Sequence, residues 1–223
     1  MTQQYDEIVE SPFLGMEIAD EDYDQLQCKK GQFIYCEGST PLGAHFVNKG
    51  KVKISRIGSD GKEQIMRIAT PGEMLSYTDL ISNTRYTTSA KALEDGSLLF
   101  IPKQDFWNTM KEQNKLYEQF VQMLSKDLTE AEERITDLAY KPVRGRLADA
   151  LVSLAKKFNK NEHLGNMSIH ITRSDLACFV GTAKETVNRL VSEFRKEQII
   201  TTEGTRINIV NLQKLKSISR LYE

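Results

Sequence analysis

The sequence predicts an α+β protein in which an antiparallel β-roll or jelly roll is followed by a long helix and a helix-turn-helix with a β-hairpin wing. Three observations predict this order. Glycine-spaced strand runs come first, a stretch without Gly or Pro follows, and two helical segments around a glycine precede a hairpin near the C-terminus. We place these parts at residues 1–110, 111–140 and 141–223.

The composition argues against several other classes of protein. No stretch approaches the roughly 20 uncharged apolar residues of a membrane span, and MTQQYDEIVE lacks the layout of a signal peptide, so we expect a cytoplasmic protein. Cys28, Cys36 and Cys178 are scattered without C-x-x-C spacing. This spacing argues against disulfides, zinc and a four-cysteine iron-sulfur cluster, and we predict no metal site.

Charge divides the chain into two opposite parts. Residues 1–139 hold 15 Lys and Arg against 23 Asp and Glu, a balance of −8, whereas residues 140–223 hold 15 against 8, a balance of +7. A basic C-terminal part suits a phosphate backbone, because bound cationic side chains release the counterions of a polyanion. The acidic remainder would discourage indiscriminate adsorption.

The predicted roll consists of short strand-like runs. Glycines at positions 31, 38, 50, 61 and 72 separate the runs QFIY, AHFVNKG, KVKISRI and EQIMRIA, and SLLFIP adds a further strand. In KVKISRI, Val52 and Ile54 alternate with Lys51, Lys53 and Ser55, which predicts a half-buried strand. The Asp-Gly pair of IGSDGKE predicts that this strand and the next form a hairpin.

The stretch from Lys103 to Leu138 has no Gly or Pro. Apolar or small residues recur there at alternating steps of four and three, at Tyr117, Val121, Leu124, Leu128, Ala131, Ile135 and Leu138. This stripe is typical of a coiled-coil seam and predicts a dimerisation helix. The alternative, a helix packed only on its own roll, stays open because a similar stripe serves either partner.

A further helix begins near Pro142, whose fixed φ suits a first helical turn. Its predicted buried face comprises Leu147, Leu151, Leu154 and Ala155. Beyond it, the sequence predicts a cap at Thr172, a helix over Ser174–Val180, a turn at Gly181, a helix over Ala183–Lys196 and a hairpin turning at Glu203-Gly204.

The second helix of this pair has two chemically different faces. Its core side comprises Val187, Leu190, Val191 and Phe194, and the opposite face carries Lys184, Glu185, Asn188 and Arg189. Arginine can fork onto guanine, glutamate can accept from cytosine, and asparagine can bridge an adenine edge. We predict base contacts from Glu185, Asn188 and Arg189, and phosphate contacts from Thr172, Arg173, Thr182 and Lys184. The alternative is the ordinary polar face of an amphipathic helix.

The order of these motifs resembles the Crp-Fnr family of bacterial transcription regulators over nearly the whole chain. VRGRLADALVSLA, ITRSDLA and GTAKETVNRLVSEF follow the roll and the long helix in the family's order. The resemblance implies a cyclic-nucleotide-binding-like sensor roll, a homodimer, a winged helix-turn-helix on double-stranded DNA, and contact with RNA polymerase. It assigns Glu185 and Arg189 to base edges and Asn188 to a variable specificity position.

The sensor departs from the cyclic-AMP-binding branch of the family that the chain resembles. In that branch a Gly-Glu pair and a later Arg-Ser pair hold the ribose hydroxyl and the phosphate. Here Ser76 and Tyr77 stand in place of Gly-Glu, and Tyr86 and Thr87 fall near the Arg-Ser position. We therefore predict a member that does not bind cyclic AMP, with an effector pocket for an unidentified ligand at Ser76, Tyr77, Arg85, Tyr86 and Thr87.

Other chemistries are weakly supported by the residues. Cys28 and Cys36 cannot supply the four ligands of an iron-sulfur cluster, and no cofactor is predicted, although haem stays open through His45, Met66, Met74 and Cys36. A cupin-like enzyme would need several histidines in the roll, where only His45 occurs, so we predict no enzyme. The alternative function is a ligand-sensing barrel whose winged helix binds proteins instead of DNA, which the balance of +7 disfavours.

Overall fold

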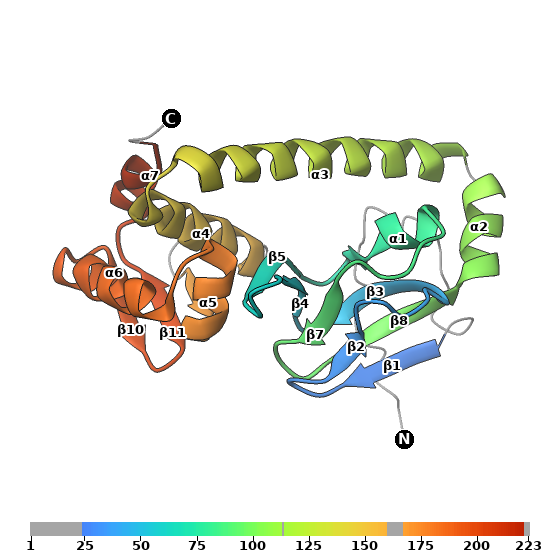
Figure 1. Cartoon of the computed structure of the whole chain (residues 1–223), viewed down its shortest axis with the longest axis horizontal. Helices are drawn as coiled ribbons and strands as arrows, with labels where there is room; N and C mark the ends of the chain where they lie inside the picture. The colour runs from blue at the N-terminus through green and yellow to red at the C-terminus, as the bar shows by residue number, and fades with distance from the viewer. Residues whose placement is uncertain (1–23, 113, 160–166, 221–223) are drawn as a thin grey trace, which may run out of the picture. The chain divides into compact units, whose positions relative to one another are not determined.

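The computed structural model describes residues 24–112, 114–159 and 167–220 (Figure 1). Contacts between these residues define two compact units. The first runs up to Arg56 and resumes over Met66–Asp127, and the second takes Ile57–Ile65 and continues from Leu128. The units therefore divide one long helix between them, and the sequence-based boundaries near residues 110 and 140 stay a prediction.

The first unit is built on two four-stranded sheets. One has the order β1 (Asp24–Cys28), β8 (Gly96–Pro102), β3 (Gly43–Lys49), β6 (Met74–Leu75), and the other has the order β2 (Phe33–Tyr35), β7 (Ser89–Ala92), β4 (Val52–Ile57), β5 (Glu63–Ala69). Strands β8, β3 and β6 pair antiparallel, as do β2, β7 and β4. The predicted antiparallel roll and its strand runs are confirmed.

Alternation along β3 and β8 supplies side chains to two hydrophobic clusters. The inner cluster joins the two sheets and consists of Tyr35, Val47, Val52, Ile54, Ala69, Leu75, Tyr86, Ala90 and Leu98. The outer cluster takes Ala44 and Phe46 from β3 and Leu99 and Ile101 from β8. Because successive residues of a strand point to opposite faces, β3 contributes to both clusters at once.

Three helices cover the outer cluster. They are α1 (Tyr77–Ile81), α2 (Lys103–Glu112) and the start of α3 (Asn114–Tyr140), which contributes Leu116 and Phe120. The predicted helix over 111–140 is thus observed as α3, with α2 as a separate helix before it. Among the described helices α3 is the longest, as Figure 1 shows.

The prediction of a half-buried strand at KVKISRI is wrong. Lys53 and Ser55 are buried together with Val52 and Ile54, at 8% and 5% exposure. Val52 and Ile54 belong to the inner cluster, and the burial of Lys53 and Ser55 shows that the opposite face of β4 is covered as well. The period-2 pattern identified the strand correctly but not its environment.

The second unit contains a three-stranded sheet and four helices after α3. They follow the order α4 (Val143–Phe158), β9 (Ser168–His170), α5 (Arg173–Val180), α6 (Lys184–Lys196), β10 (Ile200–Glu203), β11 (Arg206–Ile209) and α7 (Leu212–Arg220). The predicted winged helix-turn-helix is confirmed, with a wing of order β10-β11-β9. Strand β9 and helix α7 were not predicted from the sequence.

Helix α4 forms the centre of this unit. Its predicted buried residues Leu147, Leu151 and Leu154 are at most 1% exposed, and α5, α6 and α7 all contact it. Pro142 occupies the N-cap position of α4 without a capping hydrogen bond, and the helix begins at Val143. Among the residues that the structure describes, no helix combines the length and apolarity needed to cross a lipid bilayer.

Candidate nucleic-acid interface

Helix α6 separates a buried face from an exposed one, as the sequence predicts. Val187, Leu190, Val191 and Phe194 are at most 4% exposed and fill the core of the unit. Lys184, Glu185, Asn188 and Arg189 are all exposed. An apolar stripe with 3.6-residue periodicity fixes the helix on its unit and thereby fixes which side chains face solvent.

Most polar side chains on the exposed face of α6 have no hydrogen-bond partner among the described residues. Among the described residues, the side chains of Lys184, Glu185 and Asn188 make no hydrogen bond, whereas Arg189 donates from Nη1 to Glu193 Oε1 over 2.6 Å. Glu185 and Arg189 are four residues apart and therefore lie one helical turn from each other. This face can offer a guanidinium, a carboxylate, an amide and an ammonium group to a ligand.

The turn between α5 and α6 leaves a helix N-terminus open. Gly181 ends α5 with φ of 74°, and a Cβ there would lie 3.0 Å from Leu138 Cδ2. The N-cap of α6 is Ala183, which has no side chain that can accept a hydrogen bond from the first turn. The first N–H groups of α6, beside the half-buried Thr182, are therefore available to an acceptor such as a phosphate.

Arg146 of α4 holds this turn in place. Its guanidinium donates to Val180 O and Gly181 O, each over 3.2 Å, and to Lys141 O over 2.9 Å. The cation thus meets carbonyls at the C-terminal end of α5, where the helix dipole favours positive charge. The role of Arg146 could not be predicted from the sequence, because its acceptors at Val180 and Gly181 are backbone groups 34 and 35 residues away.

The N-terminus of α5 contains two of the predicted phosphate contacts. Thr172 accepts the N–H of Asp175 over 3.0 Å and donates its own proton to Asp175 Oδ2 over 2.6 Å, so its hydroxyl serves as the helix cap. The side chain of Arg173 is half-buried, and its Nη1 is buried without a hydrogen-bond partner among the described residues. Burial, and then the charge of Arg195, lowers the pKa of Arg173. The two cations, Arg173 and its neighbour Arg195, favour an anion at the N-terminus of α5.

The predicted effector residues do not line one common surface. Ser76 and Tyr86 both contact Tyr35, which hydrogen-bonds to Ser76 and stacks on the Tyr86 ring at 3.9 Å between centroids. Burial, with smaller contributions from Tyr35 and Asp79, raises the pKa of Tyr86 to about 12. Tyr77 instead belongs to the outer cluster and donates to Asp127 of α3.

The other two effector candidates are exposed loop residues with partners of their own. Arg85 donates to Gly38 O over 2.8 Å, and the hydroxyl of Thr87 donates to the buried Asp79 over 2.9 Å. The side chains of Ser76, Arg85 and Thr87 are therefore all bonded within the roll.

The candidate haem ligands do not converge. His45 points away from the outer cluster, whereas Met74, which pairs with the neighbouring Phe46, belongs to it. Met66 and Cys36 are exposed. Burial lowers the pKa of His45 to about 4, beside the rings of Tyr35 and Phe100. No three potential metal ligands cluster within the described ranges.

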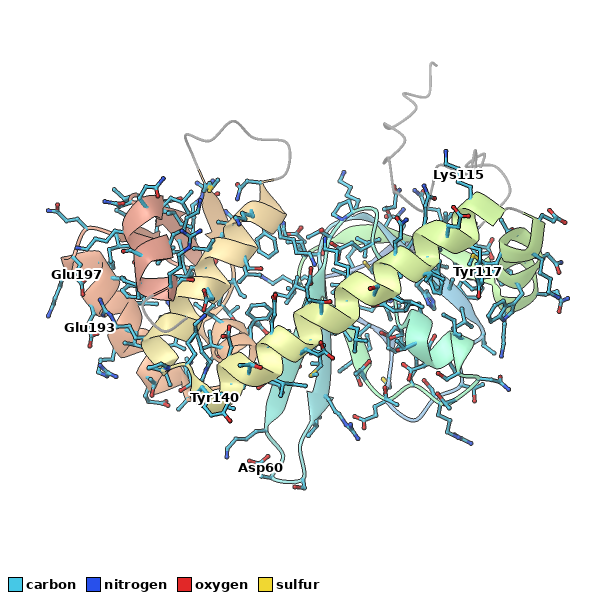
Figure 2. The ribbon with its side chains drawn as sticks, turned by 90° about the horizontal axis from the view of Figure 1, so that it is seen from above. Asp60, Lys115, Tyr117, Tyr140, Glu193 and Glu197 are labelled. Carbon is cyan, nitrogen blue, oxygen red and sulfur yellow. The ribbon has the colours of Figure 1, made fainter. Side chains whose placement is uncertain are left out.

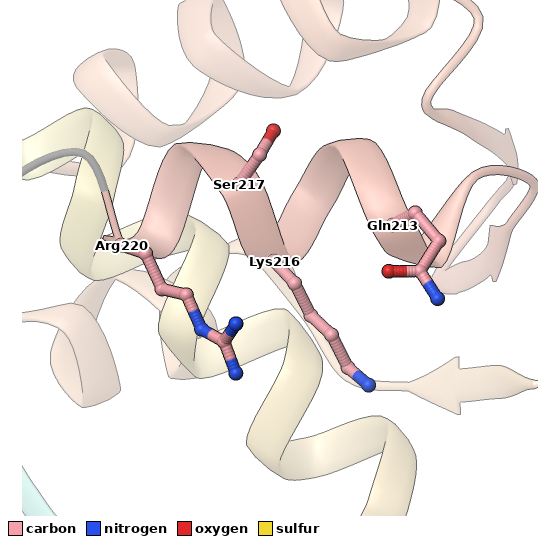
Figure 3. Close-up of a pocket in the computed structure, with 4 residues that line it drawn as sticks. All are labelled: Gln213, Lys216, Ser217 and Arg220. Atoms are coloured by element: carbon pink, nitrogen blue, oxygen red, sulfur yellow. The ribbon is translucent and has the colours of Figure 1, made fainter.

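A shallow hollow of about 350 Å³ lies on α7, the helix that packs against α4 (Figure 3). Its lining is polar and basic, from Gln213, Lys216, Ser217 and Arg220. These residues add positive charge to the C-terminal unit, but they belong to a different helix from the exposed face of α6.

The fold and this interface together define a class of protein. A β-roll followed by a long helix and a winged helix-turn-helix, with hydrogen-bonding and cationic side chains displayed on the second helix of the pair, is the construction of a DNA-binding transcription regulator.

Comparison with protein families gives the same result for both parts of the chain. The cyclic nucleotide-binding domain matches residues 25–113, and the Crp-like helix-turn-helix domain matches residues 145–218. Together they cover most of the sequence. The chain belongs to the Crp-Fnr family of transcription regulators.

Curated relatives are similar over most of their length. The chain is 28% identical to the anaerobic regulatory protein of Bacillus subtilis strain 168 over 177 residues, which cover 78% of this chain and 74% of that protein. It is 26% identical over 192 residues, or 86% of each chain, to a CRP-like cAMP-activated global transcriptional regulator of Mycobacterium tuberculosis.

Solved structures share the fold. A transcriptional regulator of the CRP/FNR family from Thermus thermophilus is 25% identical, with a TM-score of 0.75 over 90% of this chain and 100% of that one. FixK2 from Bradyrhizobium japonicum is 22% identical, with a TM-score of 0.80 over 90% of this chain and 99% of that one, and shows the likeness of the fold alone.

Proposed function

We propose that this protein is a homodimeric regulator that binds an inverted-repeat DNA site through α6 and responds to an effector at the β-roll. The observation that carries the proposal is the exposed face of α6, where Lys184, Glu185 and Asn188 have no partner among the described residues. If this polar face only kept the helix soluble, the uncapped N-terminus of α6 beside it would have no role.

Base recognition falls to Glu185, Asn188 and Arg189. An α-helix fits the major groove, where arginine donors match guanine O6 and N7 and a carboxylate accepts from the cytosine amino group. Since Glu185 and Arg189 are one turn apart, they address neighbouring base positions. Lys184, Thr182 and Arg173 supply phosphate contacts at the N-termini of α6 and α5, and Thr172 supports the same edge as a helix cap.

A second copy of the chain covers the stripe on α3. Six of its seven residues are exposed, among them Leu128 at 61% and Ile135 at 68%, and only Leu124 is half-buried, against the outer roll cluster. The stripe runs along α3 between the two ends labelled by Tyr117 and Tyr140 in Figure 2. Burying a leucine stabilises an interface by about 1.5–3 kcal/mol, so parallel pairing of two such helices forms a stable dimer.

The effector differs from cyclic AMP. One relative is described as cAMP-activated, but the Gly-Glu pair of such sensors is replaced here by Ser76 and Tyr77, which supply no carboxylate. A ligand near Tyr77, Tyr86 and Thr87 would alter the roll where Tyr77 bonds to α3. We also propose that the protein contacts RNA polymerase, as the resemblance to the family implies.

Selection from a library of randomised duplexes tests the proposed function. Full-length protein should enrich an inverted repeat whose half-sites lie about one helical turn, ~34 Å, apart, because a two-fold dimer places its two copies of α6 in successive major grooves. The control is a variant with Ala at positions 185, 188 and 189, which should enrich no motif. Failure of the wild type to enrich any motif would favour the protein-binding alternative for the winged helix.

A further inference from the structure

Arg144, Glu193 and Arg189 form a row of ion pairs, and Arg189 is the arginine proposed to contact a base. Glu193 Oε1 accepts from Arg189 Nη1 over 2.6 Å, and Glu193 Oε2 accepts from Arg144 Nη1 over 3.1 Å. Arg189 and Glu193 belong to α6, whereas Arg144 lies on α4. The carboxylate of Glu193 is therefore held between two guanidinium groups, one on its own helix and one on the helix behind it.

Arg144 is itself fixed on three sides. Its Nη2 donates to Glu197 Oε1 over 2.7 Å, its Nη1 binds Glu193, and its guanidinium lies 4.8 Å from the centroid of the buried Phe194 ring. Its side chain is 29% exposed. An arginine with bonds to two carboxylates and a stacked ring has few alternative rotamers, so Glu193 meets an anchored partner.

The contact with Glu193 leaves one edge of Arg189 open. Nη1 is occupied, whereas Nε and Nη2 have no protein acceptor among the described residues. A guanine presents O6 and N7 side by side and needs two parallel donors. The Nε and Nη2 edge supplies these donors while Nη1 stays on Glu193, so both contacts can exist together.

We propose that Glu193 is a positioning residue for sequence recognition. It holds Arg189 with its free edge outward and partly neutralises it, and Arg144 holds Glu193. A positioned guanidinium loses less conformational freedom when it binds a base, and a partly neutralised one gains less from a phosphate. Glu193 thereby favours the specific site over random DNA. The inference rests on the proposed function, since it assumes that Arg189 contacts a base.

Glu197 provides a matched control within the same structure. It has the same chemistry as Glu193 and shares its partner Arg144, but it contacts Arg144 and Lys214 and not Arg189. Figure 2 shows Glu193 and Glu197 near each other on the C-terminal unit. Glu193→Gln and Glu197→Gln each remove one negative charge and one partner of Arg144, and only the first releases Arg189.

The experiment measures the affinity of the full-length protein for its selected duplex and for a scrambled duplex of equal length. Both variants should bind the scrambled duplex more tightly than the wild type, because each has lost a negative charge. The ratio of the two affinities should fall about two- to fivefold per half-site in Glu193→Gln, the size expected for a half-exposed ion pair, and stay unchanged in Glu197→Gln.

A double variant separates positioning from general electrostatics. If Glu193 acts through Arg189, adding Glu193→Gln to Arg189→Ala should leave the affinity ratio of Arg189→Ala as it is. An equal fall in Glu197→Gln, or a further fall in the double variant, would overturn the inference. An unchanged ratio in Glu193→Gln would also overturn it while the proposed function stands. A wild type without any sequence preference would instead overturn the proposed function and this inference with it.

Discussion

The winged helix-turn-helix and the β-roll use their polar side chains in opposite ways. On α6, Lys184, Glu185 and Asn188 reach solvent without a partner among the described residues. In the roll, polar side chains of the predicted effector residues bond to other residues of the roll, Ser76 to Tyr35 and Thr87 to Asp79. The first region displays a ready surface, and the second has already satisfied its own groups.

This difference has an energetic consequence. A ligand at α6 displaces mainly water, whereas a ligand between Tyr35, Ser76 and Tyr86 must separate a stacked ring pair and a buried hydrogen bond. Each buried hydrogen bond is worth about 1 kcal/mol net, and a polar group left unpaired costs more. An effector that shifts the roll must therefore form contacts in the shifted state that exceed this cost.

The largest expected effect comes from breaking the proposed dimer, because the DNA then meets one copy of α6 instead of two. Leu128→Glu places charges in the seam of the proposed dimer, and should convert the protein to a monomer. Affinity for the inverted repeat should fall about 100-fold or more, because two linked modules bind far more tightly than one. Light scattering and a DNA-binding titration measure the two effects.

The matched control for this variant is Gln122→Glu, an exposed polar position on α3 outside the stripe, which should leave the dimer intact. A wild type that is monomeric at micromolar concentration, with and without DNA, would show that the seam has been misinterpreted.

The second prediction sharpens the description of α6 by separating base contacts from phosphate contacts. Arg189→Ala should cost about 1–3 kcal/mol per half-site and relax the preference at one guanine. Lys184→Ala should weaken binding to all sequences alike and reduce the slope of log affinity against log salt by about one unit. Competition binding on a randomised library at two salt concentrations measures both quantities.

The two variants serve as controls for each other, since both remove a cation from the exposed face of α6. If Arg189→Ala loses equal affinity for specific and random DNA and keeps the selected motif, Arg189 is a phosphate contact.

The third prediction concerns His45, which lies beside the rings of Tyr35 and Phe100 in the roll. Burial lowers the pKa of His45 from its usual value near 6.5 to about 4, so the unfolded chain binds more protons between these values. The stability that neutral His45 contributes is complete above pH 6.5 and is lost as the pH falls toward 4. Between pH 7.5 and 5 this loss is about 2 kcal/mol.

Urea unfolding followed by the fluorescence of Trp107, the single tryptophan, reports on this unit. His45→Gln should lose roughly 2 kcal/mol less than the wild type over this pH range, and His170→Gln, at an exposed position, should behave like the wild type. An identical loss in His45→Gln would show that His45 is hydrated.

The sequence predicted the parts of this fold whose signals are local. The periodic apolar residues of α6, the glycine turn at Gly181 and the runs of the roll all gave the correct elements. The burial of Lys53 could not be predicted, because it depends on what packs over that face of β4, which the alternation of residues along one strand does not specify. Arg146 and Arg144 were missed for the same reason, since their partners lie on α5 and α6, far along the chain.

The candidate sites follow the same division. The exposed face of α6 could be predicted because one helix determines it. The effector pocket stays a prediction, because Tyr77 and Tyr86 belong to different clusters in the fold, and Tyr35, which contacts both Ser76 and Tyr86, comes from β2.

The smallest expected effect concerns the β-roll, where we expect no binding of cyclic nucleotides. Calorimetry with cyclic AMP and cyclic GMP should detect no saturable binding at low micromolar concentration. A ribose hydroxyl would find the Ser76 hydroxyl already bonded to Tyr35, and no carboxylate at Tyr77. Tyr35→Phe frees Ser76 but adds no carboxylate, so it should not create binding either. The relative described as cAMP-activated is the positive control. Saturable binding by the wild type would mean that the stacked Tyr35 and Tyr86 separate readily, and that the roll is as open to its ligand as α6 is to DNA.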